Sequence, residues 1–305
     1  EQEDTRPRPL PDQPEVRPEA PWLRRLPLRS PTLAPATHTN TYLVGEGALL
    51  VVDPASPYPE EQQRLVAVLD ALAAQGCRVA ALFLTHHHGD HCGGVNALRQ
   101  ALAERGIDAP LLAHSITARR VGRRGIRVDQ WLDEGAMLPF GPQGLTVLHT
   151  PGHAPGHLCL HDRAAGALVV GDMVASVGTI VIDPEDDGDM AAYLEQLARL
   201  QALAGAGARR LWPAHGTSVE DGVALLGFYQ AHRLQREGKI VAALAAAGPR
   251  APLAALLVRA YDDVPEFLHP LAERALLAHL IKLHDDGLVV YDGPRPGVKV
   301  AYRPA

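Results

Sequence analysis

The chain has 305 residues, of which 47% are hydrophobic, so it can build a sizeable core and extensive disorder is excluded. The formal net charge of -6 excludes a general attraction of the whole chain to nucleic acid, which would need a local basic patch. The apolar stretches are too short to span a bilayer, so we expect no membrane partner. Cys77, Cys92 and Cys159 form no C-x-x-C pair, which favours a reducing compartment and predicts a cytoplasmic protein.

The first segment, from Glu1 to Pro21, is charged and rich in proline, and it lacks the apolar centre of a secretory signal. We expect it to be an extended, weakly ordered arm. Short strands are predicted from Trp22 onward. Thr41–Val44 and Leu49–Val52 are apolar, flank a glycine-containing turn, and together predict a hairpin.

The middle of the chain alternates between predicted strands and helices. Apolar spacing predicts helices at 59–74, 95–103 and 190–203, the last with Asp189 as its N-cap. Strands are predicted at 79–84, 145–148, 157–160, 167–170 and 209–212. This order implies a layered α/β architecture with mixed sheets.

After about residue 220 the pattern becomes mainly helical. Helices are predicted at 223–246, 253–261 and 270–284, and two strands, 288–291 and 298–302, flank a Gly/Pro turn. This order, three helices followed by a hairpin, is typical of a winged helix. We therefore divide the chain into an arm at 1–21, a large domain at 22–230 and a small winged-helix-like domain at 231–305.

The predicted strand at 79–84 leads directly into the run Thr85-His86-His87-His88-Gly89-Asp90-His91. This run holds four potential ligands, His86, His88, Asp90 and His91, at the end of a strand, where ligands commonly gather. Histidines beside buried strands carry a desolvation cost unless something binds them. Imidazole and carboxylate are ligands of zinc, so the run predicts a metal site, from which His87 should point away.

Three later polar residues follow apolar strands in Gly/Pro turns, namely His153, Asp172 and His215. All three can reach the same rim of the sheets, and a second metal would need them. Together with the histidine run they resemble the metallo-β-lactamase superfamily, whose fold is a four-layer αββα sandwich. The resemblance implies three ligand sets: His86, His88 and His153 for a first metal, Asp90, His91 and His215 for a second, and Asp172 as a bridge.

The resemblance implies a hydrolase with two zinc ions, or other divalent metals such as manganese or iron. Two cations about 3.5–4 Å apart can hold a hydroxide as the nucleophile. Asp90 would orient that hydroxide and is the candidate catalytic residue. Behind the ligands, the resemblance suggests Asp53 as an acceptor for a ligand histidine N–H, and His157 is either a similar contact or simple packing. Cys92 is interpreted as packing.

Asp172 stands where familiar zinc β-lactamases have cysteine, which argues against antibiotic hydrolysis. His88 stands where the flavodiiron branch has a carboxylate, which argues against redox chemistry. The winged-helix order and the segment Thr39–Leu43 resemble the branch of β-lactamase-like endoribonucleases, which implies single-stranded RNA as a substrate. From Arg233 onward, however, ten basic and eight acidic residues give only +2, a weak basic bias.

The same histidine run is similar to that of glyoxalase II and of polyketide-releasing thioesterases. The alternative is therefore hydrolysis of a small thioester or ester, because a thiolate of pKa ~8.5 leaves without an acid. Five acids within Asp183–Asp189 would repel RNA if they border the pocket. A nucleic-acid-binding protein with a vestigial site is a third alternative, opposed by the complete ligand set. The oligomeric state stays open, a dimer being one option.

Overall fold

The first half of the chain forms a seven-stranded sheet in a computed structural model that describes residues 16–305. The strands follow chain order across this sheet: β1 (Arg17–Ala20), β2 (Leu23–Arg29), β3 (His38–Val44), β4 (Ala48–Val52), β5 (Arg78–Phe83), β6 (Leu111–Ala113) and β7 (Gln130–Trp131). β1 to β4 pair antiparallel and β4 to β7 pair parallel. The predicted hairpin is confirmed as β3 and β4, with Tyr42 opposite Val52.

The predicted arm lies outside the described residues from 1 to 15, but residues 17–20 form β1 instead of a weakly ordered segment. β1 pairs with β2, and Arg25 Nε donates to Glu19 Oε1 at 2.6 Å. Pro18 is tolerated in β1 because β1 is an edge strand, where a residue without an N–H need not break a hydrogen bond of the sheet. The mostly buried ion pair anchors a segment whose composition alone predicts little order.

The second sheet has five strands in the order β12-β11-β10-β9-β8. Its members are β8 (Met137–Leu138), β9 (Leu145–His149), β10 (Leu158–Asp162), β11 (Ala167–Gly171) and β12 (Arg210–Pro213). β8 to β11 pair antiparallel, and β11 and β12 pair parallel.

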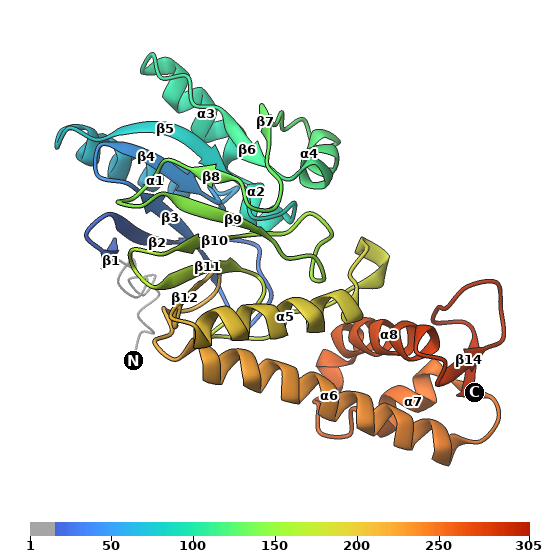
Figure 1. The fold of residues 1–305 in the computed structure, drawn as a ribbon. Helices are drawn as coiled ribbons and strands as arrows, with labels where there is room; N and C mark the ends of the chain where they lie inside the picture. Colours follow the sequence, from blue (N-terminus) through green and yellow to red (C-terminus); the bar gives the residue numbers. More distant parts are fainter. Residues whose placement is uncertain (1–15) are drawn as a thin grey trace, which may run out of the picture.

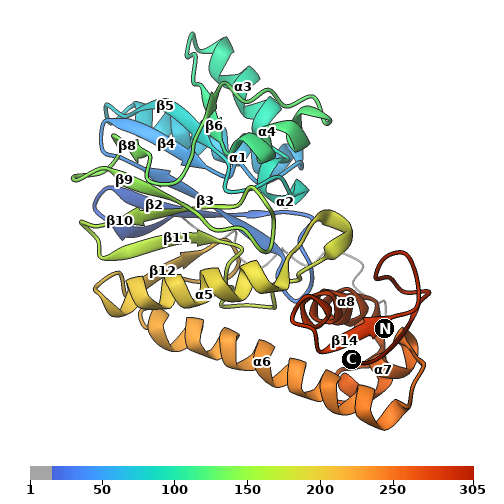
Figure 2. The ribbon, with the colours of Figure 1, turned by 45° about the vertical axis from the view of Figure 1, so that its right-hand side comes forward.

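Helices cover the outer face of each sheet (Figure 1). α1 (Pro59–Ala73) and α3 (Val95–Glu104) share a core with the first sheet, and α5 (Met190–Gly205) and α6 (Gly222–Ala247) share one with the second. A third core fills the space between the sheets. The arrangement is the expected four-layer αββα sandwich, also seen in the turned view of Figure 2.

Strand β4 shows why its sequence is a continuous apolar run. Side chains alternate across a strand, so Leu49 and Val51 enter the core under the helices while Leu50 and Val52 enter the core between the sheets. Both faces are buried, and no polar position is left between them. This burial fixes the end of β4, and with it the backbone that carries Asp53.

The N-terminus of α5 offers a test of local stability. Asp189 Oδ1 accepts from Ala192 N at 2.9 Å, which makes Asp189 the N-cap that the sequence predicts. Replacing Asp189 by alanine is expected to lower the free energy of unfolding by about 1 kcal/mol, measured by urea denaturation. Asp189→Asn keeps an acceptor oxygen and should retain most of that stability, so equal losses in the two variants would contradict the capping role.

The C-terminal part has its own core and a three-stranded sheet. It contains β13 (Ala251–Pro252), α7 (Leu253–Ala260), α8 (His269–Asp285), β14 (Val289–Tyr291) and β15 (Ala301–Pro304). α6 runs unbroken through the predicted boundary at 230: Leu226 belongs to the core of the second sheet and Ile240 to that of the C-terminal part. One long helix therefore connects the two parts.

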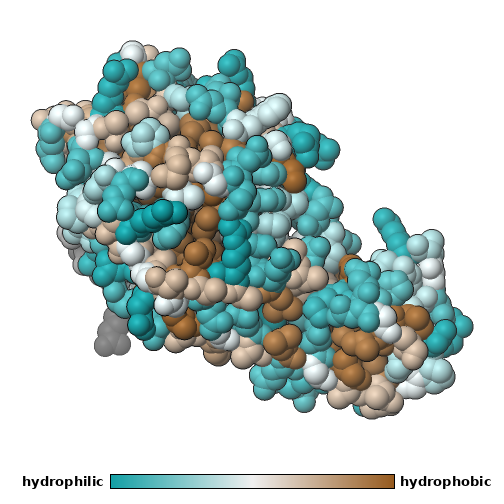
Figure 3. Space-filling model, in the orientation of Figure 1, coloured by the Kyte–Doolittle hydropathy of each residue, from teal (hydrophilic) through white to brown (hydrophobic). Residues whose placement is uncertain are grey.

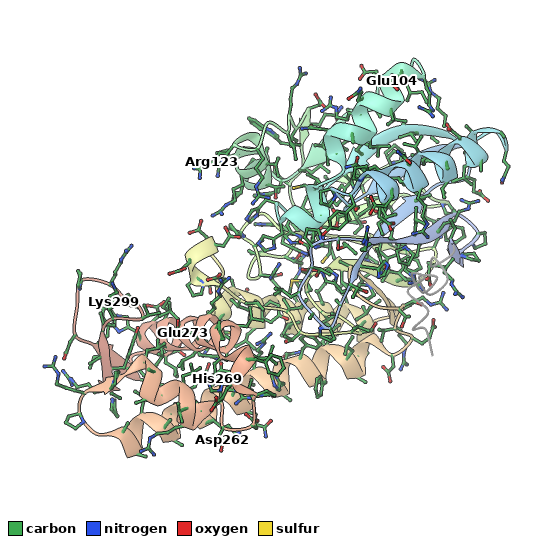
Figure 4. All side chains as sticks on the ribbon, turned by 180° about the vertical axis from the view of Figure 1, so that it is seen from behind. Glu104, Arg123, Asp262, His269, Glu273 and Lys299 are labelled. Carbon is green, nitrogen blue, oxygen red and sulfur yellow. The ribbon has the colours of Figure 1, made fainter. Side chains whose placement is uncertain are left out.

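The surface of the C-terminal part carries both charges and apolar side chains. Glu273 lies on α8 and Lys299 on the loop between β14 and β15 (Figure 4), and from Arg233 onward ten basic residues stand beside eight acidic ones. Apolar side chains gather over part of the same module (Figure 3), and Val241 of α6 and Val258 of α7 are exposed. Within residues 16–305 no helix is long and apolar enough to cross a membrane.

Candidate metal centre

The candidate ligands lie at one rim of the sandwich because the strands that precede them end there. β4 and β5 are parallel neighbours, so Asp53 and the histidine run leave the first sheet side by side. In the second sheet, Asp172 follows β11 and His215 follows the parallel strand β12. His153 lies in the turn between β9 and β10. The seven predicted ligands fall into two groups at this rim.

The first group brings together His86, His88, His153 and Asp172. His88 Nδ1 lies 2.9 Å from both His86 Nε2 and His153 Nε2, and these two Nε2 atoms are 3.3 Å apart. Burial and the neighbouring His88 lower the pKa of His153 to about 4, and burial holds the pKa of His86 well below its ordinary value. At neutral pH the rings of His153 and His86 are therefore uncharged and offer lone pairs to a cation.

The second group consists of Asp90, His91 and His215. His215 Nε2 is 3.6 Å and His91 Nε2 is 3.9 Å from Asp90 Oδ2. Burial acts to lower the pKa of both histidines, but their partners together raise both pKa values. Asp172, Asp90 and Asp53 raise the pKa of His91, and Asp172 and the backbone carbonyl of His38 raise that of His215. A cation bound here would take the place of those protons, because metal ligands must be deprotonated.

Asp172 stands between the two groups and turns one oxygen toward each. Its Oδ2 is 3.4 Å from His153 Nε2, while its Oδ1 is 3.2 Å from His215 Nε2 and 3.5 Å from His91 Nε2. Burial acts to raise the pKa of Asp172, but the charges of His215 and His91 hold it well below its usual value. Asp172 therefore contacts histidines of both groups.

Buried atoms without hydrogen-bond partners test whether this donor set suits metal ions. Among the described residues, His91 Nε2 and Asp172 Oδ1 are both buried and lack such a partner. Leaving buried polar atoms unsatisfied is costly, and bound cations would satisfy both atoms. Divalent zinc is commonly bound by imidazole and carboxylate donors, so these residues are suitable zinc ligands.

The residues behind the ligands hold them by short hydrogen bonds. His91 Nδ1 lies 2.8 Å from Asp53 Oδ2, and the same carboxylate accepts from Thr85 N at 2.8 Å and Thr85 Oγ1 at 2.7 Å. His157 Nε2 accepts from Asp172 N at 3.1 Å, and its Nδ1 lies 2.8 Å from Thr150 Oγ1. Asp53 thus orients His91, and His157 holds the backbone that carries Asp172.

Sequence reasoning missed the residues that surround these ligands. Asp186 Oδ2 is 2.7 Å from His88 Nε2 and 3.0 Å from His87 Nε2, so His87 faces Asp186 and is absent from the two main groups. Arg120 and Arg274 contact the acidic run at Asp186 and Asp183. The acidic run stands out in the sequence, but no sequence pattern indicates that it folds back to contact His88.

A cavity of about 450 Å³ opens over the two groups. Its apolar lining residues include Leu33, Ala36, Val177, Ile180 and Val181. Its charged lining residues include Asp183 and Asp186 of the acidic run, Arg124, and Arg274 of α8. The C-terminal part therefore contributes directly to the cavity, and the acidic run does border it.

An αββα sandwich with clusters of histidine and aspartate at one rim that could hold metal ions defines a class of proteins. Residues 34–215 match the family described as "Metallo-beta-lactamase superfamily", and residues 253–295 match "Beta-lactamase associated winged helix domain". The first match spans more than half of the chain. The chain belongs to the metallo-β-lactamase superfamily, whose members are generally hydrolases, and it carries the associated winged helix.

Curated relatives cover most of the chain. It is 32% identical to "Lactamase-like protein vrtG" of Penicillium aethiopicum over 77% of this chain and 70% of that protein. It is 30% identical to "Atrochrysone carboxyl ACP thioesterase AacuM" of Aspergillus aculeatus over 86% of this chain and 80% of that protein. A "Beta-lactamase-like protein 2 homolog" of Caenorhabditis elegans is 28% identical over 68% of this chain, a match that spans 65% of the worm protein.

Two solved structures share the fold over nearly the whole chain. A β-lactamase domain protein from Burkholderia ambifaria has a TM-score of 0.81 at 22% identity and covers 98% of this chain and 96% of its own. A metallo-β-lactamase family protein from Thermus thermophilus has a TM-score of 0.74 at 24% identity, with 94% and 99% covered. These likenesses extend through the C-terminal part and concern the fold alone.

Proposed function

We propose that this protein is a dinuclear zinc hydrolase that cleaves thioesters of small acyl or carrier-bound acyl substrates. The observation that supports two metal ions is the position of Asp172, whose two oxygens face two separate ligand groups. Two bound zinc ions would lower the pKa of a water molecule toward ~7 and neutralise charge that develops on the substrate carbonyl oxygen. The ligands would be His86, His88 and His153 for one ion and Asp90, His91 and His215 for the other, with Asp172 shared.

The residues of the chain supply orientation around that chemistry. Asp90 lines the cavity and keeps 16% of its side chain exposed, so it can accept a hydrogen bond from an attacking water molecule. Asp53 holds His91, and His157 holds the backbone at Asp172. Because these contacts are buried, little reorganisation is needed when substrate enters.

The cavity lining supports a thioester substrate over RNA, although the sequence resemblance implied RNA as the first candidate substrate. Its apolar lining residues suit an acyl chain, and its two arginines, Arg124 and Arg274, are balanced by Asp183 and Asp186, so no excess of positive charge attracts a polyanion. A thiolate with a pKa of ~8.5 leaves without protonation, so no general acid is required in the cavity. The chain's relatives named as acyl-carrier thioesterases, such as that of Aspergillus aculeatus, lend the same proposal support.

A side-by-side assay tests the substrate. The zinc-loaded protein would be given an acyl-pantetheine thioester, its oxygen-ester analogue and a single-stranded RNA of mixed sequence. We expect turnover of the thioester that stops after chelation and returns with added zinc. Cleavage of RNA without thioester turnover would replace the proposal with the endoribonuclease, and loaded protein inactive on all three would favour the vestigial site.

A further inference from the structure

His88 is held from both sides of its ring. Its Nδ1 faces the first ligand group, 2.9 Å from His86 Nε2 and from His153 Nε2. Its Nε2 faces the opposite way and lies 2.7 Å from Asp186 Oδ2. When one ring nitrogen binds a metal the other carries the proton, so His88 Nε2–H is placed to donate to this carboxylate.

Asp186 is itself held by an arginine side chain from another part of the chain. Arg120 of α4 (Ser115–Gly122) donates from Nη1 to Asp186 Oδ1 at 2.6 Å. The guanidinium also pairs with Asp187, the next residue of the acidic run. One carboxylate oxygen is thus occupied by Arg120, and the other faces His88 at 2.7 Å and His87 at 3.0 Å. Charge-assisted bonds of this kind are stronger and more directional than neutral ones.

The same contacts decide against a third metal at this place. His87, His88 and Asp186 are close enough together to hold a cation by distance alone. Arg120 Nη1, however, lies 3.4 Å from His87 Nε2 and 2.6 Å from Asp186 Oδ1. Arginine is always charged, so a divalent cation would meet a fixed positive charge at contact distance. Asp186 therefore acts here as an acceptor.

We propose that Asp186, fixed by Arg120, is a positioning residue that holds His88 with Nδ1 toward the first metal. The inference rests on the proposed metal centre and assigns a role to the acidic run, which the hydrolytic chemistry leaves unused. The run is also attached to the C-terminal part, because Arg274 of α8 donates to Asp183 Oδ2 at 2.9 Å. The winged helix thereby helps to hold the segment that orients a ligand.

Zinc affinity, not hydrolysis, tests the proposal. Zinc binding by the full chain would be measured by competition with a chromophoric chelator, and cobalt substitution would report the geometry of each site. Asp186→Ala is expected to weaken binding of one of the two zinc ions about 10- to 100-fold. Asp186→Asn keeps an acceptor oxygen and should lose less. Arg120→Ala should weaken the same ion, and its effect should not add to that of Asp186→Ala.

Asp187→Asn is the matched control, because Asp187 also pairs with Arg120 but makes no contact with His88 among the described interactions. It should stay within about threefold of the unmodified protein, well short of the 10- to 100-fold loss at a residue that supports a ligand. Equal zinc affinity in Asp186→Ala and Asp187→Asn would overturn the proposal. The proposal would also be overturned if the unmodified chain bound a third zinc ion and the Asp186→Ala variant lost it, because Asp186 would then be a ligand. A chain that binds no zinc would overturn the proposed function as well.

Discussion

Replacing His88 by alanine is expected to remove the first metal and to lower kcat/KM for the thioester by at least about 10³-fold. His88 Nδ1 lies within 2.9 Å of two other ligand nitrogens, and its removal leaves His86, His153 and the shared Asp172. A bound cation contributes several kcal/mol to stabilising charge in the transition state, and each 1.36 kcal/mol is a factor of ten. Losing one ion therefore costs roughly three powers of ten.

Metal content and activity would be measured on the same preparations of His88→Ala. His232→Ala is the control, because His232 lies on α6 beside Phe228 and outside both ligand groups. It should keep both metal ions and full kcat/KM. A His88→Ala protein that retains full activity after metal depletion would refute the metal-dependent mechanism, since no other part of the proposed chemistry activates water.

The clustering of the candidate ligands was predictable because its signals are local. Four of the candidate ligands follow one strand within six residues, and the other three each follow an apolar strand in a Gly/Pro turn. Strand ends gather at a rim, so sequence pattern and sheet topology together bring these residues close. Asp186 carries no such signal. An acidic run looks the same whether it is a solvated loop or returns to a metal ligand, and only the tertiary contacts with Arg120 and His88 distinguish the two.

The strands and the helix that the sequence did not predict have too little hydrophobic periodicity, or too few apolar residues, to be recognised. β6, β7 and β8 have two or three residues each, too few to show an alternation. The N-cap of α4 is His114, whose Nδ1 accepts from Ile116 N in place of the usual Ser, Thr, Asp or Asn cap. Its sequence also holds adjacent arginines and little apolar surface. The missed helix is the one that supplies Arg120.

Gly152→Ala is expected to lower the free energy of unfolding by about 3–5 kcal/mol and to displace the adjacent candidate ligand His153. Gly152 has a φ of +140°, and a Cβ added there would lie 2.4 Å from Tyr193 Cα and 2.6 Å from Tyr193 N. These are backbone atoms of α5 and cannot move aside as a flexible side chain would. Backbone strain of about 1–3 kcal/mol and overpacking of similar size account for the expected loss.

Gly207→Ala separates the two contributions to that loss. Gly207 has a φ of +131°, close to that of Gly152, but a Cβ added there would meet nothing within 4 Å. Urea unfolding of Gly207→Ala should therefore show the backbone strain alone, about 1–3 kcal/mol, with zinc content unchanged. Equal losses in the two variants would mean that the contact with Tyr193 relaxes freely. A larger loss in Gly152→Ala together with reduced zinc content would show that the packing of this turn on α5 fixes the position of His153.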